Sequence, residues 1–298
     1  MTEVLSINQL TKYYGTLCAL NQVSFKVPEK SIFGILGPNG SGKTTLLGSL
    51  TDVFIPTSGI YQWFGETSHY TQRKHIGTLL ETPHFYPYLS AYDNLCINAT
   101  IKGCPKKDVD RVLTISGLSD RAGSLFRTFS LGMKQRLALA SVMLGNPSVI
   151  VLDEPTNGLD PTGIAEIRKL IIQMGQQGKT IIMASHLLDE VEKVCTHVVI
   201  LKKGKLLSEG PVNEVLSGNA VIEIASEDLE LLQKTIMAFP GLKSINQVNH
   251  TLRLSVEESV RDEDINRFCF ANGITLHLLR RVKESLENKF IELTEGNL

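Results

Sequence analysis

Hydrophobic positions in the first fifty residues follow a strand pattern that leads into a glycine-rich segment and then a helix. Apolar residues cluster or alternate over residues 4–10 and 23–27, and a run typical of a buried strand covers residues 31–36. These runs predict three short strands. Helical spacing begins at residue 43 and continues to about residue 50. The glycine-rich segment between the last strand and this helix is the first candidate for a functional loop.

Strand and helix patterns alternate again in the second half of the chain. The segments are an apolar run at residues 149–152, a helical pattern near 162–176, a run at 180–184, a helical pattern near 188–194 and a run at 198–201. Such alternation is typical of βαβ units. It predicts an α/β fold, in which a mostly parallel sheet carries helices on its faces.

The segment from about residue 87 to residue 145 has mainly helical spacing. Ser90 and the acidic residue three positions later resemble a capping box, and the helix that they open stops near Gly103. A second helix is predicted over residues 108–116, and a third begins just after Ser130. We therefore expect a helical subdomain within residues 87–145.

From about residue 220 the pattern changes and predicts a separate, small α+β domain. The order is strand, helix, two strands, helix and strand, at residues 221–225, 229–238, 243–248, 251–256, 262–272 and 275–279. This βαββαβ order is typical of a ferredoxin-like sandwich. A last amphipathic helix is predicted to carry Leu286, Phe290 and Leu293 on one stripe. We therefore divide the chain into residues 1–216 and 220–298.

Composition and charge narrow the classes of function. Of 298 residues, 42% are hydrophobic and 20% charged, and the formal net charge is −1, so overall charge does not favour nucleic acid as a partner. No apolar run reaches the roughly 20 residues that span a bilayer, and the N-terminus lacks a secretory signal pattern. Five scattered cysteines are typical of reduced cytosolic thiols. We expect a cytoplasmic protein that depends on other chains for any work in a membrane.

The glycine-rich segment fits the P-loop pattern G-x-x-x-x-G-K-[ST] between a predicted strand and a predicted helix. Its residues are Gly37, Pro38, Asn39, Gly40, Ser41, Gly42, Lys43 and Thr44, and Thr45 follows in the helix. Glycines let successive backbone N–H groups turn toward phosphate oxygens, and the helix N-terminus adds a favourable dipole. We expect this segment to bind ATP, with Lys43 at the β- and γ-phosphates and the Thr44 hydroxyl on Mg²⁺.

Two carboxylates end the apolar run at residues 149–152. Asp153 can bind Mg²⁺ directly or through water, and Glu154 is then placed to orient and deprotonate the attacking water. His186 follows the next predicted strand and is expected across the sheet end from the γ-phosphate. Each feature alone is weak, because acidic residues also end strands as solvated termini and a lone histidine is usually a surface residue. Beside a P-loop they form a consistent set.

Five motifs resemble those of the ABC transporter ATPases in order and spacing, and the match extends from residue 1 to about residue 215. They are the P-loop, Ser130-Leu131-Gly132-Met133, Leu152-Asp153-Glu154-Pro155, Gly158-Leu159-Asp160 and Ser185-His186. The resemblance implies that Tyr14 stacks on adenine and that His186 is the switch residue at the γ-phosphate. It also implies that residues 130–133 form a signature loop, which closes in trans on ATP held by a second subunit. Asp160 would then lie at the dimer interface.

Two positions depart from the family pattern. The family signature is commonly Leu-Ser-Gly-Gly-Gln, whereas residues 129–133 read Phe-Ser-Leu-Gly-Met. Only Ser130, which supplies a hydroxyl, and Gly132, which allows a close backbone approach, are kept. The loop that usually carries Gln has Glu81 instead, and we expect this carboxylate to bind Mg²⁺ when Mg²⁺-ATP is present. Both departures are similar to the exporter branch that handles bacitracin or lantibiotic peptides.

The resemblance therefore implies an ATPase motor of an exporter. It acts as a head-to-tail homodimer on the inner face of the cell membrane, with polytopic transmembrane permease subunits and without nucleic acid. An import motor is one alternative. A soluble ABC ATPase acting on ribosomes or DNA is another, although this chain has one ABC half and residues 45–129 leave no room for a long coiled coil.

Overall fold

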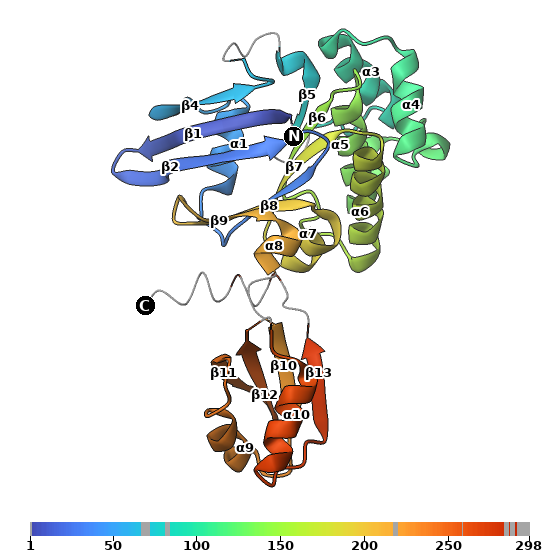
Figure 1. The fold of residues 1–298 in the computed structure, drawn as a ribbon. Coiled ribbons are helices and arrows are strands. Elements are labelled where there is room, and N and C mark those ends of the chain that lie inside the picture. The colour runs from blue at the N-terminus through green and yellow to red at the C-terminus, as the bar shows by residue number, and fades with distance from the viewer. Residues whose placement is uncertain are drawn as a thin grey trace. The chain divides into compact units, whose positions relative to one another are not determined.

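The computed structural model describes residues 2–66, 72–80, 84–216, 220–257 and 259–282, together with Leu286 and Phe290. Figure 1 shows two compact units, Met1–Val212 and Asn213–Leu298. Each unit has its own sheet and its own hydrophobic core. Glu81 and most of the predicted last helix, including Leu293, lie outside the described residues. No described helix is long and apolar enough to cross a membrane.

The first unit is built around a six-stranded sheet whose order is β5-β6-β7-β3-β8-β9. The strands are β5 (Ile76–Leu79), β6 (Val149–Asp153), β7 (Thr180–Ser185), β3 (Ile32–Leu36), β8 (His197–Lys202) and β9 (Lys205–Pro211). The first five run parallel, and β9 pairs antiparallel with β8. Every residue of β3 and β7 is buried, as continuous apolar runs favour. The predicted mostly parallel α/β sheet is confirmed, and the carboxyl ends of β6, β7 and β3 lie side by side.

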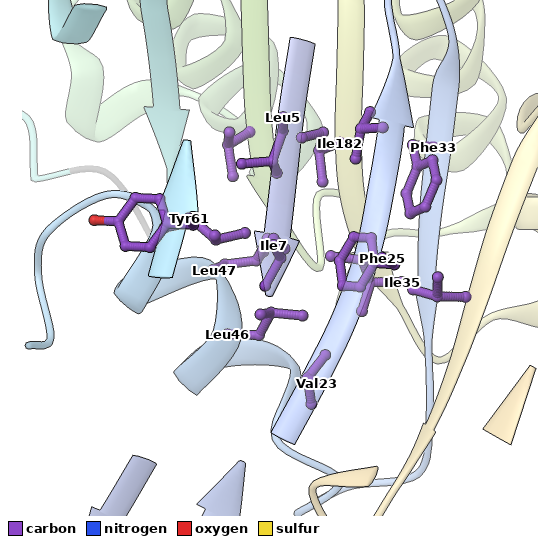
Figure 2. Packing of buried hydrophobic residues seen from close by; sticks show 14 of the residues in the cluster. Leu5, Ile7, Val23, Phe25, Phe33, Ile35, Leu46, Leu47, Tyr61 and Ile182 are labelled. Carbon is purple, nitrogen blue, oxygen red and sulfur yellow. The ribbon is translucent and has the colours of Figure 1, made fainter. Parts of the chain in front are cut away.

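A second, antiparallel sheet of order β2-β1-β4 packs with the main sheet around helix α1. These elements are β1 (Glu3–Tyr14), β2 (Leu17–Pro28), α1 (Lys43–Leu50) and β4 (Ser58–Trp63). Figure 2 shows Leu5 of the antiparallel sheet, Leu46 of α1 and Ile35 of β3 in one hydrophobic cluster. The indole Nε1 of Trp63 also donates a hydrogen bond to Leu50 O at 2.9 Å. Packing on both sides and this bond at its last turn therefore fix the position of α1.

Serine side chains cap two helices of the predicted helical region. Helix α3 (Ala91–Lys102) begins after Ser90, whose Oγ accepts a hydrogen bond from Asp93 N at 3.0 Å, and it ends at the left-handed Gly103. Helix α5 (Leu131–Met143) begins after Ser130, whose Oγ accepts from Met133 N at 3.3 Å. Both serines satisfy backbone N–H groups that a helix start leaves without partners. The other described α-helices before β10 are α4 (Lys107–Ile115), α6 (Pro161–Gln176), α7 (Leu188–Val194) and α8 (Val212–Leu216).

The second unit has a four-stranded antiparallel sheet of order β11-β12-β10-β13. Its elements are β10 (Ala220–Ala225), α9 (Leu229–Ile236), β11 (Leu242–Val248), β12 (Thr251–Val256), α10 (Asp262–Ala271) and β13 (Leu278–Val282). This is the βαββαβ order of a ferredoxin-like sandwich. Strand β13 begins later than predicted, because the preceding residues first close a turn. In that turn Ile274 N donates to Cys269 O at 2.9 Å, and His277 N then donates to Ala225 O, at the end of β10, at 3.0 Å.

A buried carboxylate connects three strands of this second sheet. Glu223 of β10 is 4% exposed, and it points to the face opposite its core neighbour Ile222. Arg280 Nε donates to its Oε2 at 2.7 Å and Thr251 Oγ1 donates to its Oε1 at 2.9 Å. Arg253 Nε lies 3.6 Å from Oε1. The hydrogen bond from Arg280 and the other favourable contacts hold the pKa of Glu223 below its usual range, although burial acts in the opposite direction.

We predict that Glu223→Gln lowers the free energy of unfolding of the second unit by about 2 kcal/mol at pH 7, since two arginines lose their carboxylate. Because the folded-state pKa is depressed, the contribution of Glu223 is complete above the unfolded pKa of about 4.3. It is lost as pH falls through the folded pKa. Calorimetry on the full chain should therefore show a gap between wild type and variant that closes in acid.

The exposed Glu227 provides the matched control, because Glu227→Gln removes the same charge from the surface of the same unit. Its unfolding should follow that of wild type at each pH. Equal unfolding of the two variants at pH 7 would contradict the role assigned to Glu223.

Candidate functional site

The P-loop turns closely against neighbouring backbone. A Cβ on Gly37 would lie 2.5 Å from Leu201 O, and a Cβ on Gly42, whose φ is +105°, would lie 2.5 Å from Ala19 O. Side chains therefore do not fit at these two positions. Ser41 is 2% exposed, and its Oγ has no hydrogen-bond partner among the described residues. The loop is thus a tight backbone turn of the kind whose N–H groups cradle phosphate oxygens.

Lys43 is the first residue of α1, and its side chain folds back onto the loop. Its Nζ donates to Gly37 O at 2.8 Å and to Pro38 O at 3.4 Å. The same nitrogen lies 3.6 Å from Glu154 Oε1, and the side chain is only 7% exposed. Two carbonyls and one carboxylate therefore surround the ammonium group, and phosphate oxygens can replace all three as its acceptors.

Glu154 connects the carboxyl ends of β6 and β7. Its backbone is left-handed with φ +47°, and its N–H donates to Ala184 O at 3.0 Å. Its Oε2 accepts from the backbone N of His186 at 3.3 Å and lies 2.7 Å from His186 Nδ1. A non-glycine residue in this conformation is strained and needs surrounding contacts to hold it. The three candidate catalytic residues, Lys43, Glu154 and His186, therefore meet at one carboxylate.

Oxygen atoms suited to Mg²⁺ lie on the same strands and helix. Thr44 is in the first turn of α1, and Asp153 is the last residue of β6, where it pairs with Ala184 of β7. Hydroxyl and carboxylate oxygens are ligands that Mg²⁺ favours, and this ion usually takes its remaining ligands from water and substrate phosphates. Thr44 and Asp153 therefore fit the metal. The third expected ligand, Glu81, lies outside the described residues.

A cavity of about 470 Å³ lies beside the P-loop. Tyr14, Gly42, Thr44 and Thr45 line it, and Tyr14 as a whole residue is 43% exposed. An accessible aromatic ring next to a phosphate-binding loop offers a flat base a surface for stacking. Lys203, from the turn between β8 and β9, also lines this cavity. The sequence motifs do not include Lys203.

Ser130, Gly132 and Asp160 form a second group at the N-termini of α5 and α6. The Oδ1 of Asp160 accepts from Gly163 N at 2.9 Å, so Asp160 caps α6. A Cβ on Gly132 would have only one atom within 4 Å, the Cα of Gly163. Across the part of the chain that the structure describes, no hydrogen bond or ion pair joins this group to Glu154 or to its partners. The candidate residues thus form two groups that no hydrogen bond or ion pair between described residues connects.

Comparison with known sequences identifies relatives along the whole chain. Residues 20–157 match the family model described as ABC transporter. The bacitracin transport ATP-binding protein BcrA of Bacillus licheniformis is 36% identical over 305 aligned residues, which cover 99% of each chain. The lantibiotic transport ATP-binding protein SrtF of Streptococcus pyogenes is 37% identical over 206 residues, or 69% of this chain and 90% of that protein.

Solved structures share the fold of most of the chain. CbiO1 from Clostridium perfringens, part of the ABC transporter complex cbiONQ, has a TM-score of 0.67 and 29% identity, over 80% of this chain and 97% of its own. The ATP-binding cassette MJ0796, solved as a dimer in a post-hydrolysis state with ADP and Pi, has a TM-score of 0.63 and 25% identity, over 70% of this chain and 98% of its own. The chain therefore belongs to the family of ATP-binding proteins of ABC transporters, whose members hydrolyse ATP to drive transport.

Proposed function

We propose that this chain is the motor of an ABC exporter and that it works as a head-to-tail homodimer with two composite ATP sites. The observation that carries the proposal is the position of the Glu154 carboxylate, 3.6 Å from Lys43 Nζ and 2.7 Å from His186 Nδ1. A base (Glu154), a cation suited to phosphate (Lys43) and a second polar group (His186) thus converge beside the P-loop, at the carboxyl ends of the parallel strands. Relatives named for bacitracin and lantibiotic transport support the exporter assignment.

The proposed roles in binding follow from the donors on each element. The backbone N–H groups of residues 37–45 hold the phosphates, and Lys43 exchanges its carbonyl acceptors for the β- and γ-phosphate oxygens. Thr44 and Asp153 would hold Mg²⁺, and Glu81 would join them when nucleotide is present. The bound metal supplies positive charge that stabilises the phosphates during transfer. Tyr14 stacks on the adenine ring from the side of the cavity.

The proposed chemistry belongs to Glu154 and His186. Once Lys43 turns to phosphate, one oxygen of Glu154 is available to orient a water molecule and accept its proton. His186 Nδ1 lies within hydrogen-bond distance of the other oxygen and fixes the direction of the carboxylate. The same imidazole lies at the strand end where we place the γ-phosphate. Positioning and electrostatic stabilisation account for most of the catalysis in such phosphoryl transfers.

The second group of residues is proposed to act on the nucleotide of the partner subunit. Ser130, Leu131, Gly132 and Met133 start helix α5, whose N-terminus favours an anion. Leu131 is 50% exposed, and only the Cα of Gly163 lies within 4 Å of the Cβ position of Gly132, so a phosphate chain can approach the backbone closely. Asp160 at the start of the neighbouring helix α6 is proposed to contact the partner at the same interface.

Other parts of the transporter are assigned to separate chains. We propose that polytopic permease subunits hold the motor at the inner face of the membrane, and that the Glu81 loop and the helical region at residues 87–145 transmit its movements to them. Residues 220–298 are proposed to serve as an accessory domain beside the ATPase domain of residues 1–216. This assignment rests on the separate sheet and core of the second unit.

The test of the proposed function compares two variants of the site. Glu154→Gln should bind ATP but hydrolyse it at least about 100-fold more slowly than wild type. Because reopening of the dimer then fails, this variant should accumulate as a dimer when ATP is added, as measured by light scattering after size-exclusion chromatography. Lys43→Ala should lose both hydrolysis and ATP-induced dimerisation. If Glu154→Gln remains monomeric at saturating ATP, the composite-site model is wrong.

The P-loop geometry yields a second prediction, for Gly42→Ala. The new methyl group would meet Ala19 O at 2.5 Å in a backbone conformation of φ +105°, so the loop must move and nucleotide affinity should fall by at least about tenfold. Gly178→Ala is the matched control, since Gly178 also has a positive φ, +82°, but no atom lies within 4 Å of its Cβ position. Both variants share the backbone strain of about 1 kcal/mol. Equal ATP affinities in calorimetric titrations of the two variants would refute the close approach at Gly42.

A further inference from the structure

A lysine outside the sequence motifs lines the cavity beside the P-loop. Lys203 lies in the turn between β8 and β9, and it shares the cavity with Tyr14, Gly42 and Thr45. Its side chain belongs to an exposed residue. In the part of the chain that the structure describes, no hydrogen bond or ion pair involves this ammonium group. Lys203 therefore brings an uncompensated positive charge to the same space as the base-stacking ring and the phosphate-binding loop.

Backbone hydrogen bonds attach this turn to the P-loop. Gly204 N donates to Ser41 O at 2.9 Å, and Asn21 N donates to Gly204 O at 2.8 Å. A Cβ on Gly204 would lie 2.6 Å from Ala19 O, the same carbonyl that excludes a Cβ on Gly42 at 2.5 Å. The two glycines thus approach one carbonyl from two sides. The position of Lys203 relative to the P-loop is therefore fixed by backbone contacts and does not depend on a flexible loop.

Turn preference alone does not explain a lysine at this position. Lys202 pairs with Lys205 across the turn, so Lys203 and Gly204 are its two central residues, and their φ angles are +48° and +76°. Two-residue hairpins with positive φ at both positions favour Asn-Gly, Asp-Gly or Gly-Gly, because asparagine, aspartate and glycine tolerate the left-handed region. A lysine here is strained, and strained residues that persist beside a site are candidates for a role in it.

The charges around the cavity indicate which part of a nucleotide Lys203 would meet. Glu154 and His186 meet Lys43 on the γ-phosphate side, and none of the three lines this cavity. Tyr14, Thr44 and Thr45 line it instead, so it extends from the proposed base site along the phosphate-binding loop. A cation in this region meets groups that ATP and ADP share.

We propose that Lys203 is a further nucleotide-binding residue, whose ammonium group contacts the ribose-proximal phosphates of ATP and ADP alike. This inference rests on the proposed nucleotide site and adds a contact from the β8–β9 hairpin. It assigns to Lys203 a contribution to binding that is the same before and after hydrolysis. The expected kinetic result of its loss is therefore a higher KM for ATP with an unchanged kcat.

The experiment measures dissociation constants of ATP and ADP for the full-length chain. Lys203→Gln should weaken both nucleotides by a similar factor of about five, the scale of a partly exposed charge contact. Lys203→Arg should retain most of the affinity. Lys205→Gln, which removes the same charge two residues away in the same hairpin, is the matched control and should bind as wild type does.

Two further arms separate a charge contact from damage to the hairpin turn. Lys203→Asn favours the turn geometry, so a loss of affinity in both the Asn and Gln variants cannot come from a disturbed turn. The difference between wild type and Lys203→Gln should also shrink as salt is raised, because salt screens exposed charges. A difference that does not change with salt would overturn the phosphate contact.

The outcomes also distinguish this inference from the proposed function. If wild type and Lys205→Gln bind ATP tightly and Lys203→Gln binds equally well, the role of Lys203 is wrong and the site assignment stands. If wild type itself binds neither ATP nor ADP, the proposed function fails and the inference fails with it. A weakening of ATP but not of ADP would overturn the assignment to the shared phosphates.

Discussion

The contact between Lys43 and Glu154 joins the residue that is proposed to bind phosphate to the residue that is proposed to activate water. The ammonium nitrogen lies 3.6 Å from the carboxylate, and both side chains are largely buried. Charged groups with so little access to water need partners. Lys43 and Glu154 partner each other, and the second oxygen of Glu154 also lies within hydrogen-bond distance of His186 Nδ1. In the proposed function, nucleotide binding is an exchange of partners, in which phosphate becomes the acceptor for Lys43 and the Glu154 carboxylate is left to act on water.

The sheet order makes this contact possible. Strands β6, β7 and β3 are neighbours and run parallel, so the loops that follow them emerge at one edge, where ligands of open α/β sheets usually bind. Helix α1 keeps its position between two sheets through the shared core and through the bond from Trp63 to Leu50. Close backbone packing at Ala19 then sets the P-loop and the β8–β9 turn against each other. The site therefore depends on rigid elements around it.

Much of the fold could be predicted because its signals are local. The fully buried, mostly apolar runs of β3 and β7 and the caps at Ser90 and Ser130 all carry their information within a few residues. Strands β4, β5 and β9 were not predicted. Strand β4 begins with three exposed residues, and β5 contains Gly77, where a Cβ would lie 2.6 Å from Val142 O. Such strands are defined by neighbours distant in sequence, which the local pattern does not contain.

The candidate site likewise combines residues that local sequence patterns identify with residues that only the folded chain brings together. The P-loop and the carboxylates at residues 153–154 have local patterns whose chemistry can be interpreted from the sequence. The meeting of Lys43 with Glu154, residues far apart in sequence, requires the sheet order. The sequence around Asp160 is that of a plain turn, and only the bond to Gly163 N shows that it caps α6. Lys203 belongs to no motif, and the hydrogen bond between Gly204 and Ser41, which holds its turn against the P-loop, is visible only in the fold.

The exchange of partners at Lys43 can be observed directly in a crystal structure of the Glu154→Gln variant with Mg²⁺ and ATP. We expect Lys43 Nζ to leave the carbonyls of Gly37 and Pro38 and to contact the β- and γ-phosphates, while His186 faces the same γ-phosphate. We also expect Ser130 of the partner subunit to lie against that nucleotide. If Lys43 still donates to both carbonyls with ATP bound, or if one subunit alone completes the site, the exchange of partners in a composite site is contradicted.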